Sequence, residues 1–208
     1  MTFLVVEGPE GAGKTTLVRW LQTELEAAGV SVLTVREPGG TPVAEGARKL
    51  ALKSRHDMAL GAELFLVLAA RADLVERVIR PALQAGQVVL CDRFGLSTLA
   101  YQVAGRGLPR AEVDAALRLA TGGLEPDLTI VLDVPVTVGR ERQRTARKVR
   151  DRFEREDDGF HERVRAAYRA ADGRGVVHID ASQSKQAVRQ AAWHWVAQTA
   201  ELSLRGVS

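Results

Sequence analysis

A glycine-rich stretch near the start of this 208-residue chain constrains the fold more than any other feature. It lies between an apolar run at residues 3–6 and an amphipathic segment at residues 17–25, and it reads Gly8, Pro9, Glu10, Gly11, Ala12, Gly13, Lys14, Thr15 and Thr16. Two glycines separated by four residues and followed by Lys and Thr are typical of a turn from a strand into a helix. Such a turn belongs to the strand–helix unit of a parallel sheet.

Apolar and amphipathic segments alternate along the rest of the chain. Runs suited to buried parallel strands lie at residues 3–6, 30–35, 88–91, 128–132 and 176–179. Helical patterns separate them at residues 17–25, 64–79, 113–120, 164–171 and 188–200. The long second helix is expected to end near Pro81. This alternation predicts one α/β domain over residues 1–208, with a parallel sheet and helices on both of its faces.

Composition indicates the class of protein and its location. Apolar residues make up 46% of the chain and charged residues 26%, as in ordinary globular domains. A single cysteine, Cys91, excludes an internal disulfide and is expected of a reducing compartment. The start of the chain reads as a strand rather than a leader, and no apolar run approaches the roughly 20 residues needed to span a bilayer. We therefore expect a cytoplasmic protein with no membrane partner.

The net charge of +3 is unevenly distributed. Residues 140–155 contain eight basic and three acidic residues, so this segment carries +5 and the rest of the chain −2. A local cluster of this kind indicates a phosphate site at one place on the surface. The alternatives are a solvated arginine-rich helix and a nucleic-acid site, but no nucleic-acid-binding motif accompanies the cluster. We therefore predict a small basic lid over about residues 140–158 that closes over polyanions, and no nucleic-acid partner.

The glycine-rich stretch has the chemistry of a triphosphate site. Its backbone N–H groups can surround phosphate oxygens, and the N-terminus of the following helix adds positive potential. Lys14 is expected to reach the β- and γ-phosphates, and the Thr15 hydroxyl is expected to bind Mg²⁺. The alternative is a turn that binds nothing, which fits the motif and its context less well. The guanine-reading pattern Asn-Lys-x-Asp does not occur in the sequence, which argues against a GTPase.

Charged residues also follow the third predicted strand. Asp92 and Arg93 come directly after residues 88–91, so Asp92 is placed to hold Mg²⁺ and Arg93 to clamp a phosphate; a surface ion pair is the alternative. Glu10 is unusual within a phosphate-binding loop, and it is either a solvated acid or the acceptor for a hydroxyl of a second substrate. Arg71 lies among apolar residues of the long helix and needs either a protein carboxylate or a ligand oxygen.

Taken together, these motifs resemble those of bacterial-type thymidylate kinases, a family of P-loop nucleoside monophosphate kinases. The resemblance covers nearly the whole chain and rests on residues 7–16, 36–41, 69–71, 92–102, 132–135 and 151–154. It implies a P-loop NTPase-type α/β fold with ATP as phosphate donor, dTMP as acceptor and Mg²⁺ as cofactor. It also implies a homodimer formed through long helices.

The resemblance implies roles for individual residues. Glu10 approaches the sugar 3′-hydroxyl of dTMP, and Arg71 hydrogen-bonds its base. Further residues expected around dTMP are Glu37, Arg48, Val67, Arg93, Thr98, Tyr101 and Gln102. Two lid arginines expected near ATP are Arg140 and Arg144. The residues expected to act on the transferring phosphate are Lys14, Asp92, Arg93, Arg147 and Arg150.

One position departs from the family pattern. Members of the family have an aromatic residue four positions before the base-binding arginine, where this chain has Val67. Phe65 is two residues away and would point elsewhere on a helix. Loss of a stacking ring predicts base binding weaker by roughly 1–3 kcal/mol. Because of Val67, one alternative stays open, in which the protein is a kinase for another pyrimidine nucleoside monophosphate.

Two other functions remain as alternatives. A deoxynucleoside kinase needs a base for its hydroxyl acceptor, and Asp92 could supply one. A nucleotide-binding module without catalysis would lack Lys14, Arg93 or the basic lid, and the sequence contains all three. The sequence therefore predicts transfer of phosphate from MgATP to dTMP.

Overall fold

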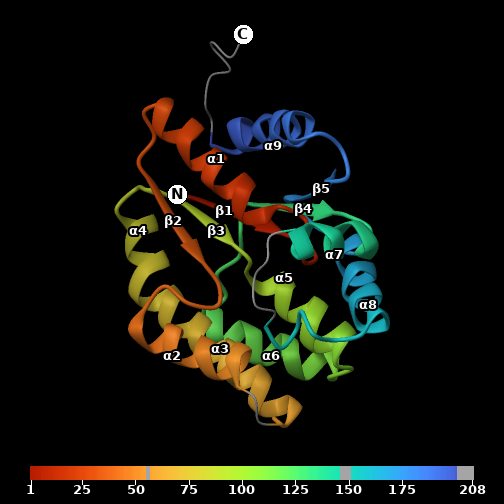
Figure 1. Ribbon diagram of the computed structural model, residues 1–208. Helices are drawn as coiled ribbons and strands as arrows, with labels where there is room; N and C mark the ends of the chain where they lie inside the picture. Colours follow the sequence, from red (N-terminus) through yellow and green to blue (C-terminus); the bar gives the residue numbers. More distant parts are fainter. Residues whose placement is uncertain (55–56, 146–150, 201–208) are drawn as a thin grey trace.

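The computed structural model describes residues 1–54, 57–145 and 151–200. A five-stranded, wholly parallel sheet in the order β2-β3-β1-β4-β5 forms its centre (Figure 1). The strands are β1 (Thr2–Glu7), β2 (Val32–Arg36), β3 (Val88–Asp92), β4 (Leu128–Asp133) and β5 (Val176–Asp180). All five predicted strands are confirmed, although β2 begins two residues later than expected. Val30 instead completes the end of the first helix, because Gly29 is left-handed (φ 79°) and the Val30 amide donates to the Leu25 carbonyl at 3.0 Å.

Helices connect the strands and follow the last one. They are α1 (Lys14–Ala27), α2 (Pro42–Lys53), α3 (Leu60–Leu74), η1 (Val75–Ile79), α4 (Arg80–Gln84), α5 (Gly95–Thr98), η2 (Leu99–Gly105), α6 (Arg110–Thr121), α7 (Val136–Thr145), α8 (Asp158–Arg169) and α9 (Lys185–Thr199). The segments η1 and η2 are π-helical. The prediction that the long helix ends near Pro81 was wrong by about one turn. Pro81 lies in the first turn of α4, directly after η1, where its missing N–H is tolerated.

Side chains of β1 alternate between two apolar layers. Leu4 and Val6 pack with side chains of α1 and α9, whereas Phe3 and Val5 pack with side chains of α3, η1 and α4. Successive residues of a strand point to opposite faces, so both faces of this sheet need a helical cover. Figure 1 shows α1 and α9 on one side and α3 and α4 on the other, which confirms the predicted layers.

The carboxyl ends of the strands meet along one edge of the sheet. The central strand is β1, with β3 and β2 on one side of it and β4 and β5 on the other. The connections after β1 and β3 lead to opposite sides of the sheet, and a crevice is expected at the edge where they diverge. Main-chain hydrogen bonds join neighbouring loops there. The Arg93 amide donates to the Val6 carbonyl at 3.0 Å, and the Glu37 amide donates to the Asp92 carbonyl at 2.9 Å. The residues that follow β1, β2 and β3 are therefore held together.

The predicted lid begins in the second half of α7 and ends at the start of α8. Its turn at residues 151–154 is closed by two reciprocal bonds: the Asp151 amide donates to Glu154 at 2.9 Å, and the Glu154 amide donates to Asp151 at 3.0 Å. Arg147 and Arg150, which were predicted to act on the transferring phosphate, lie outside the described residues. Among the helices that the structure describes, none is long and apolar enough to cross a membrane.

Candidate active site

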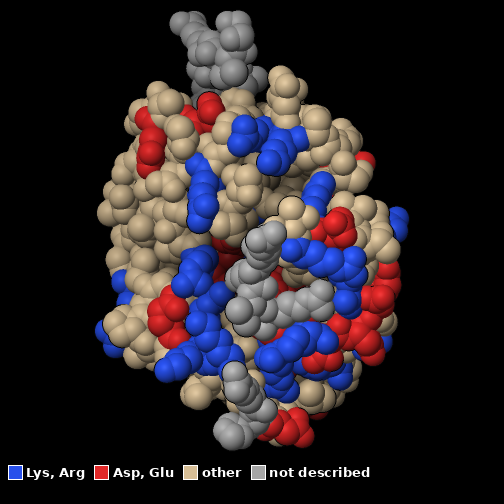
Figure 2. Space-filling model, viewed as in Figure 1, with Lys and Arg blue, Asp and Glu red and all other residues tan. Residues whose placement is uncertain are grey.

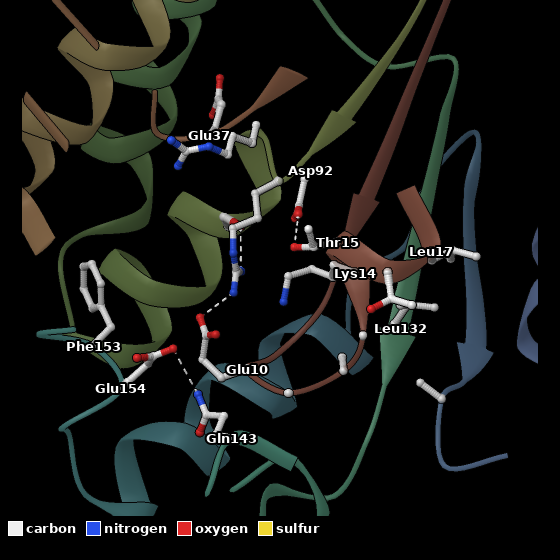
Figure 3. A pocket seen from close by; sticks show the side chains of 18 of the residues that line it. Glu10, Lys14, Thr15, Leu17, Glu37, Asp92, Leu132, Gln143, Phe153 and Glu154 are labelled. Carbon is white, nitrogen blue, oxygen red and sulfur yellow. Dashed lines mark hydrogen bonds and ion pairs between the residues drawn. The ribbon is translucent and has the colours of Figure 1, made fainter. Parts of the chain in front are cut away.

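A cavity of about 780 Å³ opens at the carboxyl edge of the sheet (Figure 3). On the face shown in Figure 2, Lys and Arg side chains gather around a hollow in which acidic side chains are visible. The predicted site residues that line the cavity are Glu10, Gly11, Ala12, Gly13, Lys14, Thr15, Thr16, Glu37, Arg48, Val67, Arg71, Asp92, Arg93, Thr98, Tyr101 and Gln102. The fold therefore brings together residues from the ends of three strands (β1, β2 and β3) and from five helical segments (α1, α2, α3, α5 and η2) that are far apart in the sequence.

The phosphate-binding loop requires glycine at its first position. Gly8 has a φ of 138°, and a Cβ atom there would lie 2.3 Å from the carbonyl oxygen of Leu132. The Lys14 amine bends back over the loop and donates to the carbonyls of Gly8 and Pro9 at 2.9 and 2.8 Å. Burial, and then repulsion from the Arg93 charge, lowers the pKa of Lys14 to about 8. These two hydrogen bonds therefore hold the Lys14 amine at the loop in which phosphates would bind.

Two side chains with oxygen atoms that could hold a metal ion lie beside this loop. The Thr15 hydroxyl donates to Asp92 Oδ2 at 2.6 Å, and both residues line the cavity (Figure 3). A hydroxyl and a carboxylate are the hard oxygen donors that Mg²⁺ prefers. Within the described part of the chain, no group of three or more His, Cys, Asp or Glu side chains could hold a metal by itself. The pair fits Mg²⁺ whose remaining ligands are phosphate oxygens and water.

Arg93 forms an ion pair with the acid of the phosphate-binding loop. Its Nη2 lies 2.5 Å from Glu10 Oε1, which also accepts a hydrogen bond from the Tyr101 hydroxyl at 2.9 Å. Its Nη1 donates to the Gly8 carbonyl at 3.2 Å. Arg93 has a φ of 76°, a left-handed conformation that costs a non-glycine residue about 1–3 kcal/mol. Glu10 is therefore not merely a solvated acid, because it joins the phosphate-binding loop to the residues that follow β3.

Arg71 is fully buried and lines the cavity. Its guanidinium donates to Glu37 Oε2 and Thr98 Oγ1, both at 2.6 Å, and to the Phe94 carbonyl at 2.9 Å. The structure thus provides the protein carboxylate that the sequence left as one of two options for Arg71. Burial raises the pKa of Glu37 to about 7, although the Arg71 charge opposes the rise. Its second oxygen has no hydrogen-bond partner among the described residues.

The predicted base-binding residues come from α3, α5 and η2. Val67 lines the cavity within an apolar cluster that also contains Tyr101 and Phe153. Phe65 is 67% exposed, which confirms the prediction that it points elsewhere. Gln102 donates to the buried Glu63 at 3.1 Å.

The lid arginines separate into two groups by their position on α7. Arg140 and Arg144, predicted near ATP, are not among the described residues that line the cavity. Arg140 instead lies 2.6 Å from Asp158, and Arg144 lies 3.3 Å from Glu141. Residues four apart share one face of a helix, and this face points away from the cavity. Arg142, on the opposite face, lines the cavity in their place.

Comparisons with known proteins identify the family. A sequence model of thymidylate kinases matches residues 6–192. The chain belongs to the thymidylate kinase family. A thymidylate kinase of Pseudomonas fluorescens is 50% identical over 192 residues, which cover 90% of this chain and 91% of that protein. A thymidylate kinase of Thermomicrobium roseum is 48% identical over 194 residues, or 92% of each chain. One of Pseudomonas syringae pv. syringae is 51% identical over 167 residues, or 80% of this chain and 79% of that protein.

Sequence reasoning missed several residues that line the cavity of this thymidylate kinase family member. They are Leu52, Gln143, Asp151, Phe153, Glu154, Gln183, Lys185, Val188 and Arg189. The last four follow β5 and begin α9. The signal that points to them is their place after the last predicted strand, because the carboxyl ends of parallel strands meet at the edge where such sites form. Asp151 and Phe153 belong to the lid motif, but their direction depends on how the turn packs.

Proposed function

We propose that this member of the thymidylate kinase family transfers the γ-phosphoryl group of ATP to dTMP, giving ADP and dTDP. The observation that carries the proposal is the meeting of two cations at one carbonyl. The Lys14 amine and Arg93 Nη1 lie 2.9 and 3.2 Å from the Gly8 oxygen. A cation of the phosphate-binding loop and a cation of the loop after β3 are therefore neighbours, as the alignment of a donor with an acceptor phosphate requires.

The acceptor in this reaction needs no general base. A phosphate monoester loses its second proton near pH 6, so dTMP presents an ionised oxygen at neutral pH. Asp92, the candidate base of a deoxynucleoside kinase, accepts a hydrogen bond from Thr15 instead. Catalysis then rests on alignment and on neutralisation of charge by Lys14 and Arg93. This arrangement favours a monophosphate acceptor over a nucleoside.

ATP would bind with its phosphates in the loop at residues 8–16. Thr15 and Asp92 would hold Mg²⁺, which when bound neutralises charge on the β- and γ-phosphates. Arg142 approaches from α7, where it donates to the carbonyls of Gly11 and Ala181 at 3.4 and 3.0 Å. Arg147 and Arg150 keep their predicted role on the transferring phosphate.

The acceptor would occupy the end of the cavity between Arg93 and Arg71. Its base would meet polar groups of Arg71 and apolar walls formed by Val67 and Phe153. We propose that Phe153 offers ring contact that Val67 lacks, so that a pyrimidine base still has an aromatic neighbour. The remaining residues proposed around dTMP are Glu10, Glu37, Arg48, Thr98, Tyr101 and Gln102.

The proposed reaction is tested with purified protein, MgATP and a panel of pyrimidine monophosphates together with thymidine. Release of ADP should be fastest with dTMP, and faster with dTMP than with thymidine at every concentration. Val67→Phe, assayed beside the wild type, should lower KM for dTMP if ring contact limits base binding. A preference for thymidine, or for another monophosphate, would reject dTMP as the acceptor.

Lys14→Ala is the matched control for this assay. The variant removes the amine near the phosphates but leaves the glycines of the loop in place, so phosphoryl transfer should fall by roughly 100-fold or more without loss of the fold. Circular dichroism would check that the fold persists. Near-normal turnover in this variant would contradict the role assigned to Lys14.

We also propose that the protein acts as a homodimer in the cytoplasm. The neighbouring helices α3 and α6 carry exposed large apolar side chains at Leu60, Phe65 and Leu119, and such side chains on adjacent elements favour an interface. The single cysteine, Cys91, is buried and free, which suits a reducing compartment. Sedimentation velocity should detect a dimer, and Phe65→Glu should shift it towards the monomer. A wild-type chain that sediments as a monomer at micromolar concentration would reject this part of the proposal.

A further inference from the structure

Glu7 is a fully buried carboxylate that has no part in the roles described above. It is the last residue of β1 and directly precedes Gly8, the first glycine of the phosphate-binding loop. A buried acid is unfavourable unless hydrogen bonds satisfy its oxygens. The donors that surround Glu7 therefore indicate what the residue does.

Both oxygens of Glu7 accept hydrogen bonds from residues outside its own strand. Oε1 accepts from the backbone amides of Phe94 and Ser97 at 2.7 and 3.0 Å. Oε2 accepts from the Ser97 hydroxyl at 2.7 Å and from the Tyr168 hydroxyl at 3.0 Å. Three of these four donors belong to the chain that follows β3. Glu7 thus fastens that segment to the end of β1.

These bonds enclose Arg93. On its N-terminal side, the Arg93 amide donates to the Val6 carbonyl at 3.0 Å. On its C-terminal side, the next amide is the one held by Glu7. Arg93 has a left-handed φ of 76°, which persists only where the surrounding structure enforces it. Two consecutive residues of β1, Val6 and Glu7, therefore accept hydrogen bonds from the main chain on either side of the Arg93 Cα atom.

The same partners also reach the Arg93 side chain. Its Nη1 lies 3.0 Å from the Tyr168 hydroxyl and 3.2 Å from the Ser97 hydroxyl, and both hydroxyls bind Glu7. The guanidinium is thereby turned towards Glu10 and the Gly8 carbonyl. Glu7 acts on the direction of Arg93 through the backbone and through these two hydroxyls.

We propose that Glu7 is a positioning residue for phosphoryl transfer, which it serves by fixing the conformation and direction of Arg93. The inference rests on the proposed function, because Arg93 is the cation assigned there to the acceptor side. Glu7 and Gly8 are consecutive, so one short stretch of chain sets both the phosphate-binding loop and the cation opposite it. A shift of either would change the distance between the donor and acceptor phosphates.

The test compares Glu7→Ala, Arg93→Ala and the double variant by steady-state kinetics with MgATP and dTMP. Glu7→Ala should lower kcat/KM for dTMP by about 100-fold, the scale of loss when a reacting group is misplaced by about 1 Å. KM for ATP should stay within about threefold of the wild-type value, because the Lys14 loop keeps its own contacts. A rise in KM for ATP as large as the loss in kcat/KM for dTMP would overturn the proposal.

A double-mutant cycle separates positioning from general destabilisation. Arg93→Ala should lower kcat/KM by about 100-fold or more in the wild-type background. In the Glu7→Ala background the same change should lower it by less than about fivefold, since Arg93 is already misdirected there. Losses that multiply in the double variant would show that Glu7 acts independently of Arg93, and the proposal would fail.

Glu7→Gln is the conservative control. Its amide oxygen can accept from both backbone amides, and its NH₂ can donate to the two hydroxyls, so kcat/KM should stay within about fivefold of wild type. Asp127→Ala removes another acid that binds the main chain of β1, at the far end of the strand, where Asp127 accepts from the Phe3 amide at 2.7 Å. This variant should leave kcat/KM unchanged, and a loss equal to that of Glu7→Ala would contradict the inference.

Thermal unfolding shows whether Glu7→Ala folds. If it does not, Glu7→Asp replaces it in the same cycle, because the shorter side chain keeps the charge but withdraws it from Phe94 and Ser97. About tenfold loss of kcat/KM is expected for Glu7→Asp, with the same insensitivity to Arg93→Ala. Wild-type protein that fails to phosphorylate dTMP would refute the proposed function itself. An active wild type with independent losses at Glu7 and Arg93 would refute only the positioning role.

Discussion

Binding of nucleotide at pH 8 should draw protons from solution, because Lys14 is partly deprotonated in the folded chain. Burial, and then repulsion from Arg93, lowers the pKa of its amine from 10.5 to about 8. Phosphate oxygens beside the amine favour its charged form and raise the pKa again. Each nucleotide that binds should therefore restore the missing fraction of a proton to Lys14.

The pKa of Lys14 sets the size of this uptake. At pH 8 about half of the amines lack a proton, so binding should take up about 0.5 proton per nucleotide. At pH 7 the uptake should fall to about 0.1 proton, and at pH 9 it should rise to about 0.9. The number of protons taken up should thus increase steeply with pH across this range.

Isothermal titration calorimetry measures the uptake directly. MgADP is titrated into the protein at one pH in buffers of different ionisation enthalpy, and the slope of observed against buffer enthalpy is the number of protons exchanged. Lys14→Arg is the matched control, because a guanidinium keeps the charge and does not titrate in this range. The difference between the two slopes isolates Lys14 from protons exchanged by the nucleotide. Equal slopes for both proteins at pH 8 would refute the assignment of a lowered pKa to Lys14.

Three further outcomes are expected. Burial, opposed by the charge of Arg71, raises the pKa of Glu37 from 4.5 to about 7, so the unfolded chain releases this proton first and the free energy of unfolding should fall as pH rises through that window. Denaturant titrations should show a weaker fall for Glu37→Gln, and equal pH slopes would contradict the assignment. Thr15→Ala should raise the Mg²⁺ concentration for half-maximal activity by about tenfold, which a metal titration of turnover would measure and an unchanged requirement would disprove. Leu21→Ala in the core should lower the free energy of unfolding by about 2–5 kcal/mol, whereas Leu50→Ala on the surface should change it by less than about 0.5 kcal/mol; comparable losses in chemical denaturation would contradict the described core.

The strands and the phosphate-binding loop were accessible to sequence reasoning because their signals are local. A strand buried on both faces is apolar along its whole length, as residues 88–91 are, and this pattern does not depend on which strand lies beside it. The loop is recognised by spacing alone, since Gly8 must tolerate both a positive φ and the close approach of Leu132. The difference at Pro81 arose because a π-helical segment before it carried the helix past the proline.

Side-chain direction was less accessible. The basic cluster at residues 140–155 was evident in the sequence, but the face of α7 that meets the cavity follows from how that helix packs. Arg142 lines the cavity, whereas Arg140 and Arg144 bind neighbouring acids. The residues after β5 join the site because β5 ends on the same edge as β1.

The sequence by itself determined the α/β class, the parallel strands, the phosphate-binding loop and the family, because each depends on short-range pattern or on motifs in register. Only the tertiary structure decided how the charged groups pair. Glu7, Glu10 and Arg93 are joined across more than 80 positions of chain by the placement of β3 beside β1. Such hydrogen bonds and ion pairs are stronger in the low dielectric of the protein interior than in water, yet no local sequence pattern specifies them. The sequence therefore predicted many of the residues that line the cavity but not those after β5, and packing decided which way each side chain points.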